Sequence, residues 1–408
     1  MQFIVQKFGG TSLLDDEMRE KVASKVIQAK QEGYSPVVVV SAIGRMGDPY
    51  ATDTLLSFAR GGNKELGPRE SDLLMSCGEI ISGVALAAII QKTGNHAVFL
   101  TGCQAGIITD NEHNNARILK VNQENIIKKA QDGSIVVVAG FQGVTEEGEI
   151  TTLGRGGSDI TAAALGVALN AAWIDIYTDV DGIMTADPRI VSDARPLEMV
   201  TYNEICQLAH EGAKVIHPRA VEIAMQKDIP LRVKCAFSDA PGTLVTSHGE
   251  VYKGTIDINR DRIVTGITHI PDITQIKILM DGVHDIPYFQ LRIFKALALA
   301  GISVDFINVH PEVILFTVKN SVAPKAVQIL ENMGITLTVQ NDCAKVAAVG
   351  AGMTGVPGVM AQIVEALAKE KIQVLQSSDS YTTIWVLVRK EDMEKSIRAL
   401  HRQFGQGV

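Results

Sequence analysis

The chain has 408 residues, of which 46% are hydrophobic and 21% charged, a composition typical of a soluble globular protein with two or three domains. Its formal net charge of −8 argues against nucleic-acid or anionic-membrane partners, because such binding needs a basic surface. The five cysteines are scattered without a CxxC pair, which argues against a zinc site or disulfide framework and favours reduced thiols in the cytoplasm. The first residues are too polar for a signal peptide, and apolar runs such as 37–40 are too short to span a membrane.

Short Val/Ile-rich runs alternate with amphipathic helical stretches up to about residue 245. We expect a helix at 16–32, ended by Gly33, and strands at 3–8, 36–41, 97–101, 135–139 and 173–178. Nearly continuous apolar strands are typical of parallel sheets buried on both faces, so the pattern predicts an α/β domain. Ligands of such sheets collect at the carboxyl ends of strands, where glycine-rich turns begin at Gly9, Ser41 and Gly140.

The polar segment 246–262 is predicted to be a linker, and a repeat with an offset of 70 residues follows it. Phe294–Val304 matches Val364–Val374, and the register continues without a gap on both sides. Each copy is typical of strand, turn, helix, strand, turn and strand, too long for a solenoid repeat. We therefore expect two small α+β modules, at 263–340 and 341–408.

Gly350–Gly355 matches the G-x-G-x-x-G pattern of dinucleotide-binding turns. The equivalent turn of the first copy, Met280–Asp285, lacks two of the three glycines, and too little sequence follows for a mononucleotide-binding half. We therefore expect no dinucleotide here, and interpret the turn as one that admits a small effector or a neighbouring backbone.

Four segments combine glycine turns with charged side chains: KFGGTS at 7–12, GRGGSD at 154–159, TDVDGIMTADPR at 178–189 and GAKVIHPRA at 212–220. Taken singly, each is also typical of an ordinary turn, a solvated acidic loop or a helix start. Together they place Lys7, Arg155, Arg189 and Lys214 near glycine turns in an acidic protein, which indicates phosphate handling. No Walker A loop is present, because G-x-x-x-x-G-K-[ST] does not occur.

These four motifs resemble, in order, those of the aspartokinases of the amino-acid kinase superfamily, and the repeat resembles their paired ACT domains. The resemblance covers essentially the whole chain and is strongest to the single-function Gram-positive form. It implies an amino-acid kinase fold at 1–245, two ferredoxin-like ACT modules, and transfer of the γ-phosphoryl of ATP to the side-chain carboxylate of L-aspartate. That carboxylate is already ionised at neutral pH, so the reaction needs charge neutralisation and in-line positioning but no general base.

The resemblance also implies a role for each matching residue. Lys7, Asp159 and Lys214 would be catalytic, with Asp159 holding the lysines in place. The residues expected to bind ATP are Lys7, Phe8, Gly9, Gly10, Ser41, Thr178, Asp179, Asp181, Arg189 and Lys214. The residues expected to bind aspartate are Thr52, Glu79, Arg155, Gly156, Gly157 and Ser158. Glu79 would accept the ammonium group and Arg155 the α-carboxylate, while Mg²⁺ would travel on the ATP phosphates without a protein ligand.

Two of these positions have a plainer interpretation as well. Glu79 alone would be typical of a helix N-terminus, where the macrodipole favours a glutamate. The segment Ala42–Ala51 is longer than the connection in many aspartokinases, and Thr52 directly follows it. Arg45 within this segment could reach substrate, but a solvated loop residue is favoured.

The ACT pair implies feedback inhibition by lysine, threonine or diaminopimelate, and a homo-oligomer, because ACT modules commonly pair across subunits. The candidate effector residues are Asp281, Asn308, Gln376, Ser377 and Asp379, in segments that are equally typical of strand-end turns. Two other functions stay open. One is a kinase of the same superfamily with another acceptor, such as glutamate, acetylglutamate, carbamate or a nucleotide. The other is a catalytically inactive amino-acid sensor.

Overall fold

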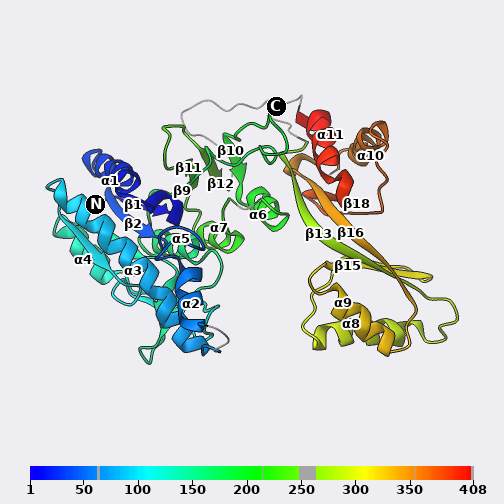
Figure 1. The fold of residues 1–408 in the computed structure, drawn as a ribbon. Coiled ribbons are helices and arrows are strands. Elements are labelled where there is room, and N and C mark those ends of the chain that lie inside the picture. The colour runs from blue at the N-terminus through cyan, green and yellow to red at the C-terminus, as the bar shows by residue number, and fades with distance from the viewer. Residues whose placement is uncertain (62–64, 214, 248–262, 354, 406–408) are drawn as a thin grey trace. The chain divides into compact units, whose positions relative to one another are not determined.

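The structure is a computed structural model of the whole chain, and it describes residues 1–61, 65–213, 215–247, 263–353 and 355–405. It divides into two compact units (Figure 1). The first comprises Met1–Met184, Pro196–His210 and Lys214–Asp257, and the second comprises Thr185–Arg195, Glu211–Ala213 and Ile258–Val408. Residues 248–262 of the predicted linker lie outside the described residues. The predicted catalytic residue Lys214 also lies outside them.

An eight-stranded sheet with the order β10-β12-β11-β9-β1-β2-β6-β3 forms the centre of the first unit. Its strands are β1 (Phe3–Phe8), β2 (Ser35–Val40), β3 (Ala97–Leu100), β6 (Ile135–Ala139), β9 (Ile174–Thr178), β10 (Met199–Thr201), β11 (Leu231–Cys235) and β12 (Thr243–Thr246). All neighbouring strands are parallel except β11 and β12. The mostly parallel sheet is therefore confirmed, and the five predicted strands agree with the structure to within one residue at each end.

Helices cover both faces of this sheet. They are α1 (Asp16–Gln31), α2 (Thr52–Arg60), α3 (Pro68–Lys92), α4 (Glu124–Gln131), α5 (Gly157–Ala168), α6 (Tyr202–His210) and α7 (Pro218–Met225). α1 and α3 pack against the face that carries Phe8, Val38 and Val40. α5 packs on the opposite face, where Gly166 leaves room for the side chain of Ile174. A second sheet of four short strands runs β5 (Ile118–Val121), β4 (Ile107–Thr109), β7 (Gln142–Val144) and β8 (Ile150–Thr152).

By length and composition alone, α3 could cross a membrane, so the expectation that the apolar runs are too short does not hold for this helix. Half of its most apolar window is buried within the protein, and the helix carries two buried acids, Asp72 and Glu79. A single apolar helix of this kind is weak evidence for a membrane, because core helices of soluble proteins pass the same test.

The second unit contains a six-stranded antiparallel sheet with the order β14-β15-β13-β16-β18-β17 (Figure 1). Its strands are β13 (Gly266–Leu279), β14 (Asp305–Val309), β15 (Val313–Lys319), β16 (Leu337–Val349), β17 (Gln376–Asp379) and β18 (Thr383–Arg389). Its helices are α8 (Ile286–Leu299), α9 (Ala323–Asn332), α10 (Val359–Lys369) and α11 (Met393–Gly405). The offset of 70 is confirmed, since it carries β15 onto β18 and the end of α8 onto the end of α10. Each copy also ends in a helix, α9 or α11, that the prediction lacked.

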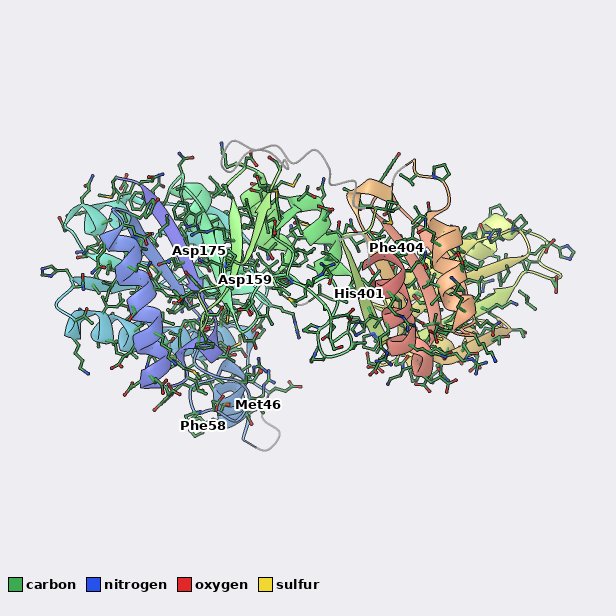
Figure 2. All side chains as sticks on the ribbon, turned by 90° about the horizontal axis from the view of Figure 1, so that it is seen from above. Met46, Phe58, Asp159, Asp175, His401 and Phe404 are labelled. Carbon is green, nitrogen blue, oxygen red and sulfur yellow. The ribbon has the colours of Figure 1, made fainter. Side chains whose placement is uncertain are left out.

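The second unit includes part of a motif from the catalytic sequence. Ala186 and Val191 lie in the hydrophobic cluster formed by the second copy of the repeat. Thr185 Oγ1 lies 2.9 Å from Nε2 of His401 on α11, a histidine labelled in Figure 2. The segment Thr185–Arg195 therefore folds with the C-terminal modules, although the sequence places it in the first domain.

The G-x-G-x-x-G turn of the second copy lies against another stretch of main chain. A Cβ atom on Gly350 would stand 2.3 Å from the carbonyl oxygen of Ile263, so no larger residue fits there. The glycine therefore admits a neighbouring backbone, which was one of the two expected uses of this turn.

Candidate active site

Lys7 and Asp159 form an ion pair at the carboxyl end of β1. Lys7 Nζ lies 2.8 Å from Asp159 Oδ1, and the two side chains are only 14% and 12% exposed. Asp159, labelled in Figure 2, belongs to the first turn of α5, where the helix dipole favours a negative charge. Its second oxygen accepts a hydrogen bond from the backbone N–H of His217 at 3.3 Å. Two of the predicted catalytic residues thus meet, and the segment just after Lys214 is tied to the same carboxylate.

The turn after β1 is shaped by close backbone contacts. A Cβ atom on Gly10 would stand 2.2 Å from the carbonyl oxygen of Ala42, and one on Gly9 would stand 3.8 Å from Lys7 Nζ. The N–H of Gly44 donates to the carbonyl oxygen of Gly10 at 3.1 Å. The turns that follow β1 and β2 therefore pack directly on each other, which leaves Gly9 beside the lysine amine.

Phe8 and Ser41, both predicted to bind ATP, flank this pair of turns. Phe8 is fully buried and stacks on Tyr177 with ring centroids 4.5 Å apart. Its side chain therefore belongs to the core, so only its backbone is left to face a nucleotide. The N–H of Ser41 donates to the carbonyl oxygen of Phe8 at 3.1 Å, which continues the β1–β2 pairing into the turn.

Glu79 is a buried acid whose hydrogen bonding is only half satisfied. It is 3% exposed and lies in the middle of α3, so the alternative interpretation of a helix N-terminus is wrong. Its Oε1 accepts from the N–H of Ala42 at 3.0 Å, whereas its Oε2 has no hydrogen-bond partner among the residues described. Burial raises the pKa of Glu79 to about 8, although the hydrogen bond from Ala42 opposes the rise. A cation at Oε2 would stabilise the ionised form.

The GRGGSD segment links β8 to α5 through a tight turn. Gly154 and Gly156 both have φ of +72°, a left-handed conformation that favours glycine. A Cβ atom on Gly156 would stand 2.4 Å from the side chain of His217. Ser158 is buried near the end of β6, where a Cβ atom on Gly140 would stand 2.8 Å from its Oγ. Arg155 is exposed between the two glycines.

The other predicted ATP residues occupy two places. Asp179 follows β9 and pairs with Arg45 at 3.3 Å, an exposed contact that brings the Ala42–Ala51 segment to this loop. Asp181 accepts from Ser238 Oγ at 2.5 Å, and Thr178 ends β9. Arg189 belongs to the second unit, where its exposed side chain pairs with Asp187 of the same loop.

Comparisons with known proteins match both parts of the chain to families. Residues 2–235 match the amino acid kinase family, and residues 338–402 match the ACT domain. The chain is 52% identical to Aspartokinase 1 of Bacillus subtilis over 405 residues, which cover 99% of both chains. It is 40% identical to Aspartokinase of Geobacillus stearothermophilus over 411 residues, covering 99% of this chain and 98% of the relative.

The chain belongs to the aspartokinases. Aspartokinases are ATP-dependent phosphotransferases, and the fold is found in solved structures as well. The aspartate kinase of Clostridium acetobutylicum has a TM-score of 0.80 and 25% identity, covering 98% of this chain and 100% of that chain. Aspartokinase III of E. coli, solved with aspartate and ADP in the R-state, has a TM-score of 0.81 and 24% identity over 99% of this chain and 100% of that one.

His217, in the motif at 212–220, lies against two of the predicted site residues although the sequence suggested no role for it. It touches Gly156 and Asp159 and precedes α7. Burial lowers its pKa, although Asp159 opposes that effect, so a neutral imidazole is favoured at neutral pH. Its position next to both motifs could not be seen in one sequence, because the segments lie about 60 residues apart.

In the second unit, the two copies of the repeat meet at predicted effector residues. Gln376 Nε2, at the start of β17, lies 2.5 Å from Oδ1 of Asn308 and 2.5 Å from the carbonyl oxygen of Phe306, both on β14. Gln275 donates to Gln376 Oε1 at 2.8 Å. The other three candidates are exposed: Asp281 in the turn after β13, and Ser377 and Asp379 on β17. The structure thus brings two of the five together.

Proposed function

We propose that this aspartokinase transfers the γ-phosphoryl of ATP to the side-chain carboxylate of L-aspartate in the cytoplasm. The product, 4-phospho-L-aspartate, would begin the synthesis of lysine, diaminopimelate, threonine and methionine. The observation that carries the proposal is the buried Oε2 of Glu79, which lacks a hydrogen-bond partner within the described part of the chain. An ammonium group is the cation that an amino-acid substrate brings to such a carboxylate.

The same small region supplies the charge for phosphoryl transfer. Ala42 links the carboxylate proposed to bind aspartate with the turn proposed to bind ATP. Its N–H donates to Glu79, and its carbonyl oxygen lies against Gly10. Lys7 is held by Asp159 close to Gly9, so its ammonium would neutralise the phosphate oxygens that gain charge in the transition state. Arg155 would grip the α-carboxylate with two parallel hydrogen bonds and point the side-chain carboxylate at the phosphate.

ATP would lie at the ends of β1 and β9. Gly9 and Gly10 would lend N–H groups to the phosphates, and Thr178, Asp179 and Asp181 would line the nucleotide. Ser41, Arg189 and Lys214 stay proposals as ATP-binding residues, as do Thr52, Gly156, Gly157 and Ser158 for aspartate. Mg²⁺ would arrive with ATP as part of the substrate. The domain boundaries at 1–245, 263–340 and 341–408 likewise remain proposals.

A hydroxylamine-trapping assay tests the reaction directly. The purified protein with ATP, Mg²⁺, L-aspartate and hydroxylamine should give aspartyl hydroxamate, whereas glutamate, acetylglutamate, carbamate and UMP should give no ATP consumption. Lys7→Ala should abolish the product. Lys21→Ala removes an exposed lysine that pairs with Glu17 on α1, so it is the matched control and should retain activity. No hydroxamate from the wild-type protein would refute the proposal.

Feedback inhibition would act through the second unit, with an amino acid bound near Asn308 and Gln376. A relative supports this idea, because E. coli aspartokinase III has been solved with lysine and aspartate in a T-state, at a TM-score of 0.74 and 24% identity. Thermal-shift and activity measurements with lysine, threonine and diaminopimelate test the proposal, and no response to any of them would remove it. Sedimentation with and without effector would test the homo-oligomer.

A further inference from the structure

Asp72 is a fully buried carboxylate in the apolar helix α3, outside the residues assigned to the site. It accepts a hydrogen bond from Nδ1 of His113 at 2.7 Å and from the N–H of Asn114 at 3.1 Å. It also accepts from Oγ1 of Thr152, the last residue of β8. A buried carboxylate is costly unless it is well paired, and an apolar residue would pack here at less cost. The arrangement that Asp72 enforces is therefore the feature to explain.

Two of the three partners of Asp72, Thr152 and Asn114, lead directly to the GRGGSD segment. Thr152 is two residues before Gly154 and three before Arg155, so its hydroxyl fixes the end of the strand that delivers this turn. Asn114 and Asn115 abut the turn from the other side. A Cβ atom on Gly154 would stand 2.9 Å from Asn115 Oδ1 and 3.1 Å from the carbonyl oxygen of Asn114.

The same helix carries Glu79, seven residues and two turns beyond Asp72. Residues seven apart lie on one face of a helix, about 10 Å apart along its axis. One end of this face thus holds the carboxylate proposed for the substrate ammonium. The other end holds the strand and turn that present Arg155 to the α-carboxylate. A second tie lies between them, because Gln142 Nε2 of β7 donates to the carbonyl oxygen of Ser76 at 3.0 Å.

We propose that Asp72 is a positioning residue that sets the distance between Glu79 and Arg155. α3 then fixes the separation between the groups that bind the ammonium and the α-carboxylate of the substrate. Asp72 holds the Arg155 turn against this helix. The inference rests on the roles proposed above for Glu79 and Arg155. The proposed role explains why α3 holds a buried acid, Asp72, that is not among the residues proposed to bind substrate.

Two substitutions separate this role from simple structural support. Asp72→Asn keeps the shape but places an amide NH₂ against groups that donate hydrogen bonds, and Thr152→Val removes one hydroxyl at nearly constant volume. We expect each to raise the KM for L-aspartate about tenfold and to leave the KM for ATP within about twofold, because small misplacements of a positioning group are costly. Thr152→Ser keeps the hydroxyl and should behave as wild type.

Two substrate analogues make the readout specific. Succinate keeps the second carboxylate but lacks the ammonium, and β-alanine keeps the ammonium but lacks the α-carboxylate. As competitive inhibitors, the two analogues should respond differently to Asp72→Asn and Thr152→Val. The Ki of succinate should rise by about the factor seen for aspartate, and the Ki of β-alanine should stay near its wild-type value, because only succinate needs Arg155.

Asp175→Asn is the matched control. Asp175, labelled in Figure 2, is 1% exposed on β9 and accepts two hydrogen bonds from Arg232, at 2.6 and 2.9 Å. Its loss should cost stability without changing the ratio of the two Ki values.

An unchanged KM for aspartate in both test variants would overturn the inference, and so would equal weakening of both analogues. If Asp72→Asn does not fold, the comparison of Thr152→Val with Thr152→Ser decides the question alone. A wild-type protein that forms no hydroxamate would defeat the proposed function itself. A wild-type protein that forms it, with variants that bind aspartate normally, would defeat only the role of Asp72.

Discussion

Replacing Glu79 by glutamine should stabilise the first unit at alkaline pH while removing aspartate binding. The pKa of Glu79 rises from 4.5 to about 8 on folding, because burial disfavours the ionised carboxylate. At about 1.4 kcal/mol for each tenfold change in proton affinity, the rise corresponds to about 5 kcal/mol at most. The folded protein therefore holds this proton more tightly than the unfolded chain. As a result, Glu79 costs stability as the pH rises through the window between 4.5 and about 8, and the full cost is present above it.

The expected signal is a difference between two pH values. Because Glu79 ionises less readily in the folded protein, the free energy of unfolding that it costs the wild-type protein grows by about 3 kcal/mol between about pH 5.5 and pH 8.5. Glu79→Gln has no carboxylate at this position to titrate. The variant should gain about that much stability relative to wild type over this range. Any cost from its buried amide NH₂ is the same at both pH values and cancels in the difference.

Intrinsic fluorescence can follow the first unit alone, because the sequence has two tryptophans, one in each unit. In a Trp385→Phe background, the fluorescence change on urea unfolding comes from Trp173, the residue just before β9. Equal stability differences between variant and wild type at the two pH values would refute the reasoning, because Glu79 would then have an ordinary pKa. In the wild-type protein, the KM for aspartate should also rise as the pH falls below about 8, since the bound ammonium needs the ionised form.

Three further substitutions test the other charged groups. Arg155→Ala should raise the KM for aspartate at least about tenfold more than that for ATP, and equal effects in steady-state kinetics would mean that this turn is a phosphate cradle. Asp159→Asn should lower kcat by about a hundredfold, since it releases Lys7 from its 2.8 Å ion pair; a near-normal kcat at saturating substrates would contradict that role. Lys345→Met should destabilise the second unit by about 3–5 kcal/mol, because it leaves Glu211 buried without its partner at 2.9 Å. Adding Glu211→Gln should restore most of that loss in Trp385 fluorescence unfolding, and no recovery in the double variant would show that the charge pair is not the cause.

Local pattern predicted five of the eight strands in the large sheet of the first unit, but not β10, β11, β12 or the four-stranded sheet. Continuous Val/Ile runs predicted β2 and β6, because strands buried on both faces leave no room for polar residues. The repeat predicted the matching strands and helices of the two C-terminal modules, although α9 and α11 lie beyond the positions that matched.

Long-range contacts were out of reach of the sequence. Asp72 forms hydrogen bonds with His113 and Thr152, which lie 41 and 80 residues away along the chain. The apolar sequence of the helix gives no signal that identifies such distant partners. The burial that makes Glu79 chemically distinctive is likewise a tertiary property. The sequence predicts one nucleotide loop at 178–189, yet the latter part of this motif folds with the second unit, because Ala186 belongs to that core.

The placement of Thr185–Arg195 has a consequence for shortened forms of the protein. A polypeptide that started near residue 246 would contain both repeats in full, yet it would lack Ala186 and Val191, which complete the packing around α11. Such a fragment would lack part of its hydrophobic core, and some of the remaining apolar side chains of that cluster would be exposed to water. A polypeptide of this kind should therefore be less stable than the same modules within the full-length chain.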